Sequence, residues 1–296
     1  MFDSSSILVI CADDNDTIMR IEIDADTQKS ICTTFAEAVQ SLTSEKAKVE
    51  FDGRYKPEQD EILHISNFQL ADEIKDAVRN PIGITAYEKI NGEYPLIKAV
   101  FAGEKVDEGD TEKFSIAFQR FRKEQYISTA NFNLFWSDNT FRYEKSYGIS
   151  ISDSIDCFYA PDEELQFSSF YYARQVFDLS GYYRSATTQE VTLFTSNESL
   201  SFENANGFEA MANSSMRRKI AAINDSDVLK KYQAIDIKRL AQEAGIAITV
   251  KNKKIVIPND KEQIKVILGF LDEEAYRGPF SQSTYLANSK RKVPNQ

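Results

Sequence analysis

The chain of 296 residues contains few cysteines, a single histidine and no long hydrophobic run. Its cysteines, Cys11, Cys32 and Cys157, are too few and too scattered for a disulfide framework or a paired metal site. No apolar run approaches the ~20 residues that a membrane-spanning helix needs. Asp3 stands where a secretory signal would carry basic residues. We therefore expect a cytoplasmic protein with no bound metal and no membrane-spanning segment.

Short catalytic signatures are also absent from the sequence. It contains no Gly-rich phosphate loop, no HExxH zinc motif and no GxSxG nucleophile motif. His64 lies in a strand-like run without a neighbouring Cys or Ser motif, which favours a packed or surface position. We therefore expect neither an enzyme nor a cofactor. A nuclease that assembles its acids from distant parts of the chain stays open as an alternative.

The formal net charge of −11 is unevenly distributed along the chain. Residues 211–296 contain 16 Lys and Arg against 9 Asp and Glu, which leaves 19 of 35 basic and 37 of 46 acidic residues to the first 210. Such an asymmetry indicates interaction with a polyanion, or an electrostatic contact between an acidic face and a basic face.

Hydrophobic periodicity predicts an α+β fold with three regions. Residues 1–112 alternate strand-like and helical patterns, which predicts a mixed α/β region. Residues 113–206 are rich in aromatic and β-branched side chains and predict a central antiparallel sheet. Residues 207–296 predict a basic helical region that also contains a β-hairpin.

Aromatic residues are concentrated between residues 132 and 183. Such a band either stacks bases, as in proteins that bind single strands, or forms the core of a sheet. Few basic residues lie between these aromatics, whereas a nucleic-acid surface needs cations beside its stacking residues. We therefore expect the band to form a core.

The last third predicts three helices followed by a hairpin. The helices are expected over 207–223, from Asp225 or Ser226 onward, and over 237–244, where Gly245 supplies the C-terminal cap. The stretch "IAITVKNKKIVIP" has two alternating apolar arms with lysines at its tip. This order matches a winged helix-turn-helix, in which the third helix and the hairpin contact DNA.

Five basic clusters in this third are the candidate DNA-binding residues, since clustered Lys and Arg are typical of phosphate contacts. The first lies in "SSMRRKIAAI", residues 214–223, where the cations flank an apolar helical stripe and are expected along one exposed ridge. The clusters are Arg217, Arg218 and Lys219; Lys230 and Lys231; Lys238 and Arg239; Lys251, Lys253 and Lys254; and Lys290, Arg291 and Lys292.

Three stretches resemble a known family. "SIDCFYAPDEELQFSSFYYARQVF", "IDIKRLAQEAGIAITVKNKKIVIP" and "VILGFLDEEAYRGPFSQSTYLANSKRKV" are similar to the B component of the Kiwa anti-phage defence system. The resemblance covers roughly residues 114–293, and the last stretch is its most specific part.

The resemblance implies a cytoplasmic, non-enzymatic protein that binds phage DNA. It implies a small transmembrane partner, the Kiwa A component, which recruits the protein to the inner membrane, where replication or transcription of phage DNA is blocked. It also implies a homo-oligomer. No catalytic residue is carried over from the family. Besides the nuclease, a scaffold that does not bind DNA stays open as an alternative.

Overall fold

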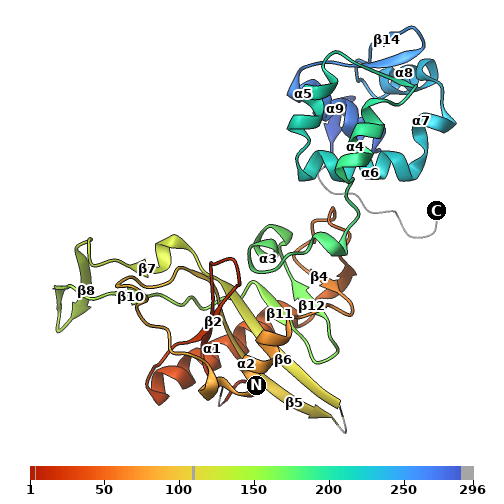
Figure 1. Ribbon diagram of the computed structural model, residues 1–296. Helices are drawn as coiled ribbons and strands as arrows, with labels where there is room; N and C mark the ends of the chain where they lie inside the picture. The colour runs from red at the N-terminus through yellow and green to blue at the C-terminus, as the bar shows by residue number, and fades with distance from the viewer. Residues whose placement is uncertain (4, 109–110, 288–296) are drawn as a thin grey trace. The chain divides into compact units, whose positions relative to one another are not determined.

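The computed structural model describes residues 1–3, 5–108 and 111–287, and the chain divides into two compact units (Figure 1). Unit 1 contains residues 1–51 and 57–179, and unit 2 contains residues 52–56 and 180–296. The expected boundary at 112/113 falls inside strand β6, and the one at 206/207 falls inside helix α5. The chain is thus divided into two units and not along the three expected regions.

Unit 1 is built on one eight-stranded sheet with the order β2-β1-β5-β6-β11-β12-β4-β3. Neighbouring strands are antiparallel except for β3 and β4, which run parallel. In chain order the strands are β1 (Leu8–Cys11), β2 (Ile18–Arg20), β3 (Ala47–Glu50), β4 (Glu61–Ile65), β5 (Ile97–Glu108), β6 (Thr111–Arg120), β11 (Cys157–Tyr159) and β12 (Leu165–Phe167). Strands of the first and the second expected region therefore share a single sheet.

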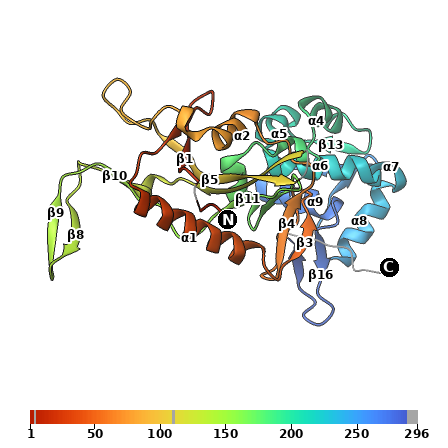
Figure 2. The same cartoon turned by 90° about the horizontal axis from the view of Figure 1, so that it is seen from below.

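Helices cover both faces of this sheet (Figure 2). Helix α1 (Ala25–Thr43) packs Phe35 and Val39 onto one face. Helices α2 (Asp72–Arg79) and α3 (Phe170–Val176) lie on the other face. Among the described residues, 3₁₀ turns also occur at η1 (Pro81–Gly83) and η2 (Lys123–Gln125) in unit 1 and at η3 (Ser180–Tyr182) in unit 2.

A separate arm leaves unit 1 between β6 and β11. Its base is the pair β7 (Tyr126–Ile127) and β10 (Gly148–Ile149), and its end is the hairpin β8 (Asn133–Ser137) and β9 (Thr140–Glu144) (Figures 1 and 2). The expectation that the aromatic band forms a core is wrong for this hairpin, because Trp136 is 62% exposed and most of its other aromatic residues are exposed too. The expectation is confirmed for β11 and β12, whose side chains are all buried.

In the described part of unit 2, up to residue 287, six helices pack around a small three-stranded sheet with the order β13-β15-β14. Strand β13 is parallel to β15, and β14 is antiparallel to it. A short hairpin, β16 and β17, follows the last helix. The elements are α4 (Thr188–Thr195), β13 (Leu200–Phe202), α5 (Ala205–Met211), α6 (Ser214–Ser226), α7 (Val228–Lys231), α8 (Ala234–Glu243), β14 (Val250–Lys251), β15 (Lys254–Ile257), α9 (Lys261–Leu271), β16 (Ala275–Arg277) and β17 (Thr284–Leu286).

The predicted α+β fold is confirmed, and so is the lysine-tipped hairpin. Asn252 and Lys253 both have positive φ, 51° and 63°, as a two-residue turn of type I′ requires. The single helix expected over 207–223 is wrong, because the chain leaves the helical conformation at Ala212 (ψ 84°) and Asn213 caps a new helix. Among the described residues, no helix is both long and apolar enough to cross a membrane.

Candidate nucleic-acid interface

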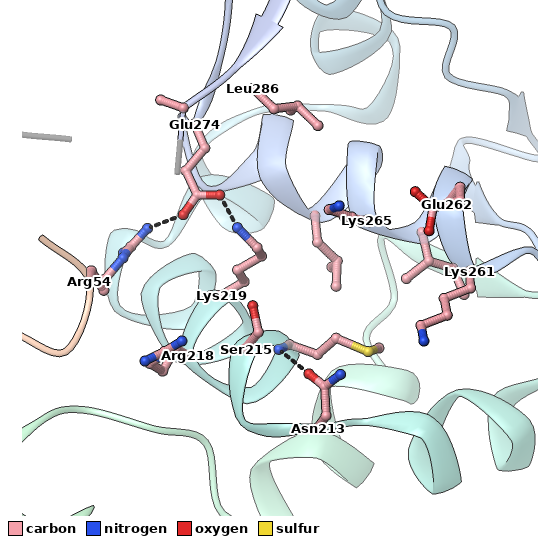
Figure 3. A pocket seen from close by; sticks show the side chains of 14 residues that line it. Arg54, Asn213, Ser215, Arg218, Lys219, Lys261, Glu262, Lys265, Glu274 and Leu286 are labelled. Carbon is pink, nitrogen blue, oxygen red and sulfur yellow. Dashed lines mark hydrogen bonds and ion pairs between the residues drawn. The ribbon is translucent and has the colours of Figure 1, made fainter. Parts of the chain in front are cut away.

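A cavity of about 390 Å³ opens in unit 2 beside helices α6 and α9 (Figure 3). Five of the side chains that line it are cations, and we call this site the basic pocket. They come from three parts of the sequence that are far apart: the 52–56 segment, α6 and α9. The five cations are Arg54, Arg218, Lys219, Lys261 and Lys265.

Helix α6 brings one edge of its surface to the basic pocket. Asn213 caps the helix, since its side-chain oxygen accepts a hydrogen bond from the backbone N–H of Met216 at 3.1 Å. Met216 and Ile220 are buried in the core of unit 2, which fixes the rotation of the helix. Residues spaced by three and four positions share a face of a helix, so Arg218 and Lys219 line the pocket together with Ser215.

Helix α9 supplies the opposite side of the basic pocket in the same way. Asp260 caps it by accepting from the backbone N–H of Gln263 at 2.8 Å, and Ile264 and Leu268 are buried. Lys261 and Lys265 follow each other by one helical turn and are both exposed. The side chain of neither lysine forms an ion pair or a hydrogen bond with any residue in 1–3, 5–108 or 111–287. These two ammonium groups are therefore available to an external anion.

Acidic side chains hold part of the basic pocket in place. Arg54 pairs with Asp272, which is almost fully buried, and with Glu274 at 3.0 Å. Glu274 also accepts from Lys219, so one carboxylate joins the 52–56 segment to α6. With Glu262 on the pocket wall, three acids oppose the five cations. The site keeps an excess of positive charge after its internal ion pairs are satisfied.

The expected exposed ridge on α6 is wrong, because all three of its cations are partly buried. Arg217 donates to the backbone carbonyls of Ala212 and Ala186, both at 3.1 Å. Arg218 donates to the carbonyl of Gly53 at 2.6 Å and lies 5.7 Å from the centre of the Tyr183 ring. Segments that are distant in sequence fold over the flanks of the helix, so these cations stabilise unit 2 from inside.

Within the part of the chain that the structure describes, the other predicted cations do not line the basic pocket. On α7, Lys230 pairs with Asp227 at 2.8 Å and keeps the pKa of that carboxyl below its ordinary value. Lys231 donates to the carbonyl of Ser226 at 2.8 Å. On α8, Arg239 pairs with Glu243 at 2.8 Å, one turn away.

The β14–β15 hairpin carries three of the predicted lysines. Lys251, Lys253 and Lys254 are all exposed around its turn, while Lys238 on α8 is half-buried. The last predicted cluster, Lys290, Arg291 and Lys292, lies outside the described residues. Of the predicted cations within the described residues, Arg218 and Lys219 line the basic pocket and the others do not.

Sequence reasoning missed three residues of the basic pocket. Arg54 was invisible because it belongs to a segment that joins unit 2 only in the folded chain. Lys261 and Lys265 are single lysines in the sequence, so a search for adjacent cations passes over them. Their spacing of four residues at the start of a capped helix is the signal that places both on one face.

Carboxylates do not cluster in a way that suits a metal ion. No group of three or more His, Cys, Asp or Glu side chains in the part of the chain that the structure describes is placed to hold one.

All three cysteines are buried and free, and burial raises the pKa of Cys157 well above the ordinary value of a thiol.

The structure is that of an α+β protein whose C-terminal unit contains a pocket lined by five cations. A family model described as "Kiwa protein KwaB-like" matches residues 105–280, which is more than half of the chain. The chain belongs to this family, as the resemblance predicted, and is a component of the Kiwa anti-phage defence system. The match includes α6 and α9 but not the 52–56 segment. Neither the curated proteins nor the solved structures gave a match.

Proposed function

We propose that this Kiwa component binds phage DNA through phosphate contacts, without enzymatic activity of its own. In this proposal the protein is cytoplasmic, works with the small transmembrane A component and with further copies of itself, and is recruited to the inner membrane. Bound there, it blocks replication or transcription of the phage DNA. The observation that carries the DNA-binding step is the convergence of five cations on the basic pocket.

Phosphate is the ligand that suits this pocket best. The free ammonium groups of Lys261 and Lys265 act as point charges, and the guanidinium of Arg218 adds a planar fork of donors. Ser215 places a hydroxyl beside them. These groups can bind a cluster of charged oxygens such as a phosphate. Contacts between such side chains and the phosphate backbone of DNA hold it without reading its base sequence.

The distribution of charge between the units supports the same proposal. Unit 2 contains 19 Lys and Arg against 14 Asp and Glu, and unit 1 holds the remaining 16 of 35 basic and 32 of 46 acidic residues. Unit 2 is therefore positive within a strongly acidic chain. DNA is expected to approach the positive unit and to be repelled by the other.

The test is DNA binding by the variant K261A/K265A over a series of salt concentrations. We expect weaker binding and a log–log salt slope that is shallower by about 0.9 for each lysine that loses a phosphate. The matched control is K29A/K123A, which removes two exposed lysines from unit 1 and should leave the slope unchanged. Both pairs lack ion-pair partners among the described residues, so neither change breaks an internal contact.

A second variant, K253A/K254A, distinguishes DNA binding at the basic pocket from DNA binding at the tip of the β14–β15 hairpin. If this variant loses affinity and K261A/K265A does not, the contact with DNA lies on the hairpin. Absence of DNA binding by the wild type at low salt would overturn the proposal and favour the scaffold. The triple substitution of Arg217, Arg218 and Lys219 is less informative, because these side chains also hold unit 2 together.

A further inference from the structure

The hairpin formed by β16 and β17 begins and ends at the basic pocket. Glu274 (Figure 3), the residue before β16, and Ala287, the residue after β17, both line this pocket. The backbone N–H of Ala287 donates to the carbonyl of Glu274 at 2.7 Å, so the two strands are still paired at this point. A ligand held by the cations of the basic pocket therefore lies beside the base of the hairpin.

Two tyrosines, which we call the tyrosine pair, continue from the pocket along one face of this hairpin. Tyr276 lies opposite Tyr285 in the register, with ring centres 5.5 Å apart and ring planes at 25°. Alternate residues of a strand share a face, so the tyrosine pair lies on the same face as Glu274 and Ala287. Two positions along a strand span about 7 Å, so each tyrosine is one such step away from a residue of the pocket.

The tyrosine pair is held in place but is not covered. On the opposite face of the hairpin, Thr284 donates to the carbonyl of Ala244 at 2.7 Å, which fixes the hairpin on the body of unit 2. The hydroxyl groups of Ser281 and Tyr285 lie 3.1 Å apart, within hydrogen-bond distance. Tyr276 nevertheless has an exposed fraction of 53%, and Tyr285 one of 43%. Their stacking covers one side of each ring, and much of the remaining aromatic surface is open to solvent.

The composition of this hairpin suits a polyanion. Residues 275–287 contain one cation, Arg277, and no acidic residue, in a chain with 46 Asp and Glu. A third aromatic side chain, that of Phe280 at the turn, is 99% exposed. The hairpin of the arm also exposes aromatic rings, but its residues 133–144 contain two acids against one cation, and none of them lines the basic pocket. The β16–β17 hairpin thus combines exposed rings with an adjacent cation site, which is typical of proteins that bind single-stranded nucleic acid.

A purely structural role explains only part of this arrangement. A cross-strand aromatic pair stabilises a hairpin, which accounts for the contact between the two rings. It does not account for the position of the pair beside a cluster of cations, on a segment without acids.

The form of the DNA follows from what an aromatic ring can reach. In a duplex the bases are paired and stacked on one another, whereas a single strand offers the faces of its bases to side chains. We propose, resting on the phosphate contacts of the proposed function, that the basic pocket and the tyrosine pair together bind single-stranded DNA. A phosphate lies at the cations of the pocket, and a nearby base stacks on the tyrosine pair.

Binding of three ligands to the full-length protein tests this proposal. The ligands are a thymidine oligonucleotide, a strand of the same length with abasic sites in place of the thymidines, and a duplex of that length. The abasic strand keeps the phosphates and lacks the bases. We expect the wild type to bind the thymidine strand about tenfold more tightly than the abasic strand, which is the usual size of one base stacked on an aromatic ring.

The variant Y276L/Y285L removes both aromatic rings and keeps an apolar side chain at each position. We expect it to bind the thymidine strand about tenfold more weakly than the wild type does, with unchanged affinity for the abasic strand and the duplex. Y276F/Y285F retains both rings and should bind the thymidine strand as the wild type does. The matched control is Y171L, which removes a tyrosine of unit 1 that is 65% exposed and should change none of the three affinities.

Three outcomes would overturn the proposal and leave the phosphate contacts of the proposed function standing. The wild type binds the thymidine strand no more tightly than the abasic strand; or Y276L/Y285L loses affinity equally for all three ligands; or Y276F/Y285F binds the thymidine strand as weakly as the leucine variant. Absence of binding to any of the three ligands by the wild type at low salt would instead contradict the proposed function, and this proposal with it.

Discussion

At the scale of single residues, the same cations have internal and external roles. Lys219 is bound by Glu274, 55 positions further along the chain, and Arg218 by the carbonyl of Gly53, 165 positions before it. Composition and spacing predicted correctly that the C-terminal part is basic. They cannot predict which of its cations form internal contacts, because the acids and carbonyl groups that bind these cations come from distant segments that only the fold brings together.

Glu190 gives a prediction about acid stability. It accepts hydrogen bonds from Arg184 and from the backbone N–H of Thr187, and these lower its pKa to about 2. Its pKa in the unfolded chain is about 4.3. Because the folded pKa is the lower one, this contribution to stability is complete above about pH 4.3 and is lost as the pH falls toward 2.

We therefore expect E190Q to be less stable than the wild type at neutral pH, by about 0.5 kcal/mol, since the pair is partly exposed and screened. The difference should shrink below about pH 4 and vanish near pH 2. Urea unfolding at several pH values measures it. E198Q, which changes an exposed acid of unit 2 without a partner among the described residues, should show no such convergence. A pH-independent difference for E190Q would contradict the prediction.

At the scale of elements, sequence patterns predicted a strand or hairpin correctly where the residues that determine it are close together in the sequence. The β14–β15 hairpin and the buried strands β11 and β12 follow from periodicity and turn residues within a few positions. The break between α5 and α6 was missed because an apolar stripe continues across it. The exposed aromatic hairpin was missed because an alternating strand pattern does not distinguish a core from an uncovered face.

The 52–56 segment gives a prediction at this scale. Gly53 has φ +76°, and a Cβ at this position would lie 2.6 Å from the Cβ of Tyr183. We expect G53A to loosen the segment from unit 2, because both the backbone and the ring must shift. Loss of about 1–3 kcal/mol in unfolding free energy is the usual size of such an effect. DNA affinity should fall as well, since Arg54 reaches the basic pocket from this segment.

Gly92 is the matched control for this change. It also has a positive φ, +90°, but a Cβ there would meet nothing within 4 Å. G92A therefore carries the backbone strain alone, and the difference between the two variants in thermal unfolding measures the contact with Tyr183. Equal effects of both substitutions on thermal unfolding would show that the close approach of Gly53 to Tyr183 does not affect stability.

At the scale of the whole molecule, the α+β class was predictable and the division into units was not. Strands β11 and β12, from the expected central region, lie between β6 and β4 in one sheet, so two expected regions merge. Such a pairing depends on long-range register, which a single sequence does not reveal. The uneven charge was visible in the sequence, and the structural unit that contains residues 211–296 keeps the same sign, with 19 basic against 14 acidic residues.

The division of charge also leads to a prediction that separates a binding protein from a nuclease. A metal-dependent nuclease needs several carboxylates around one ion, whereas two of the three acids at the basic pocket, Asp272 and Glu274, are engaged by Arg54 and Lys219. We expect purified protein to retard plasmid DNA without cutting it, in Mg²⁺ or in Mn²⁺ and equally in chelator. K261A/K265A should reduce the retardation under all these conditions. Cleavage that chelator abolishes and K261A/K265A leaves intact would place an enzyme elsewhere in the molecule, whereas cleavage lost in that variant would assign catalysis to the basic pocket itself.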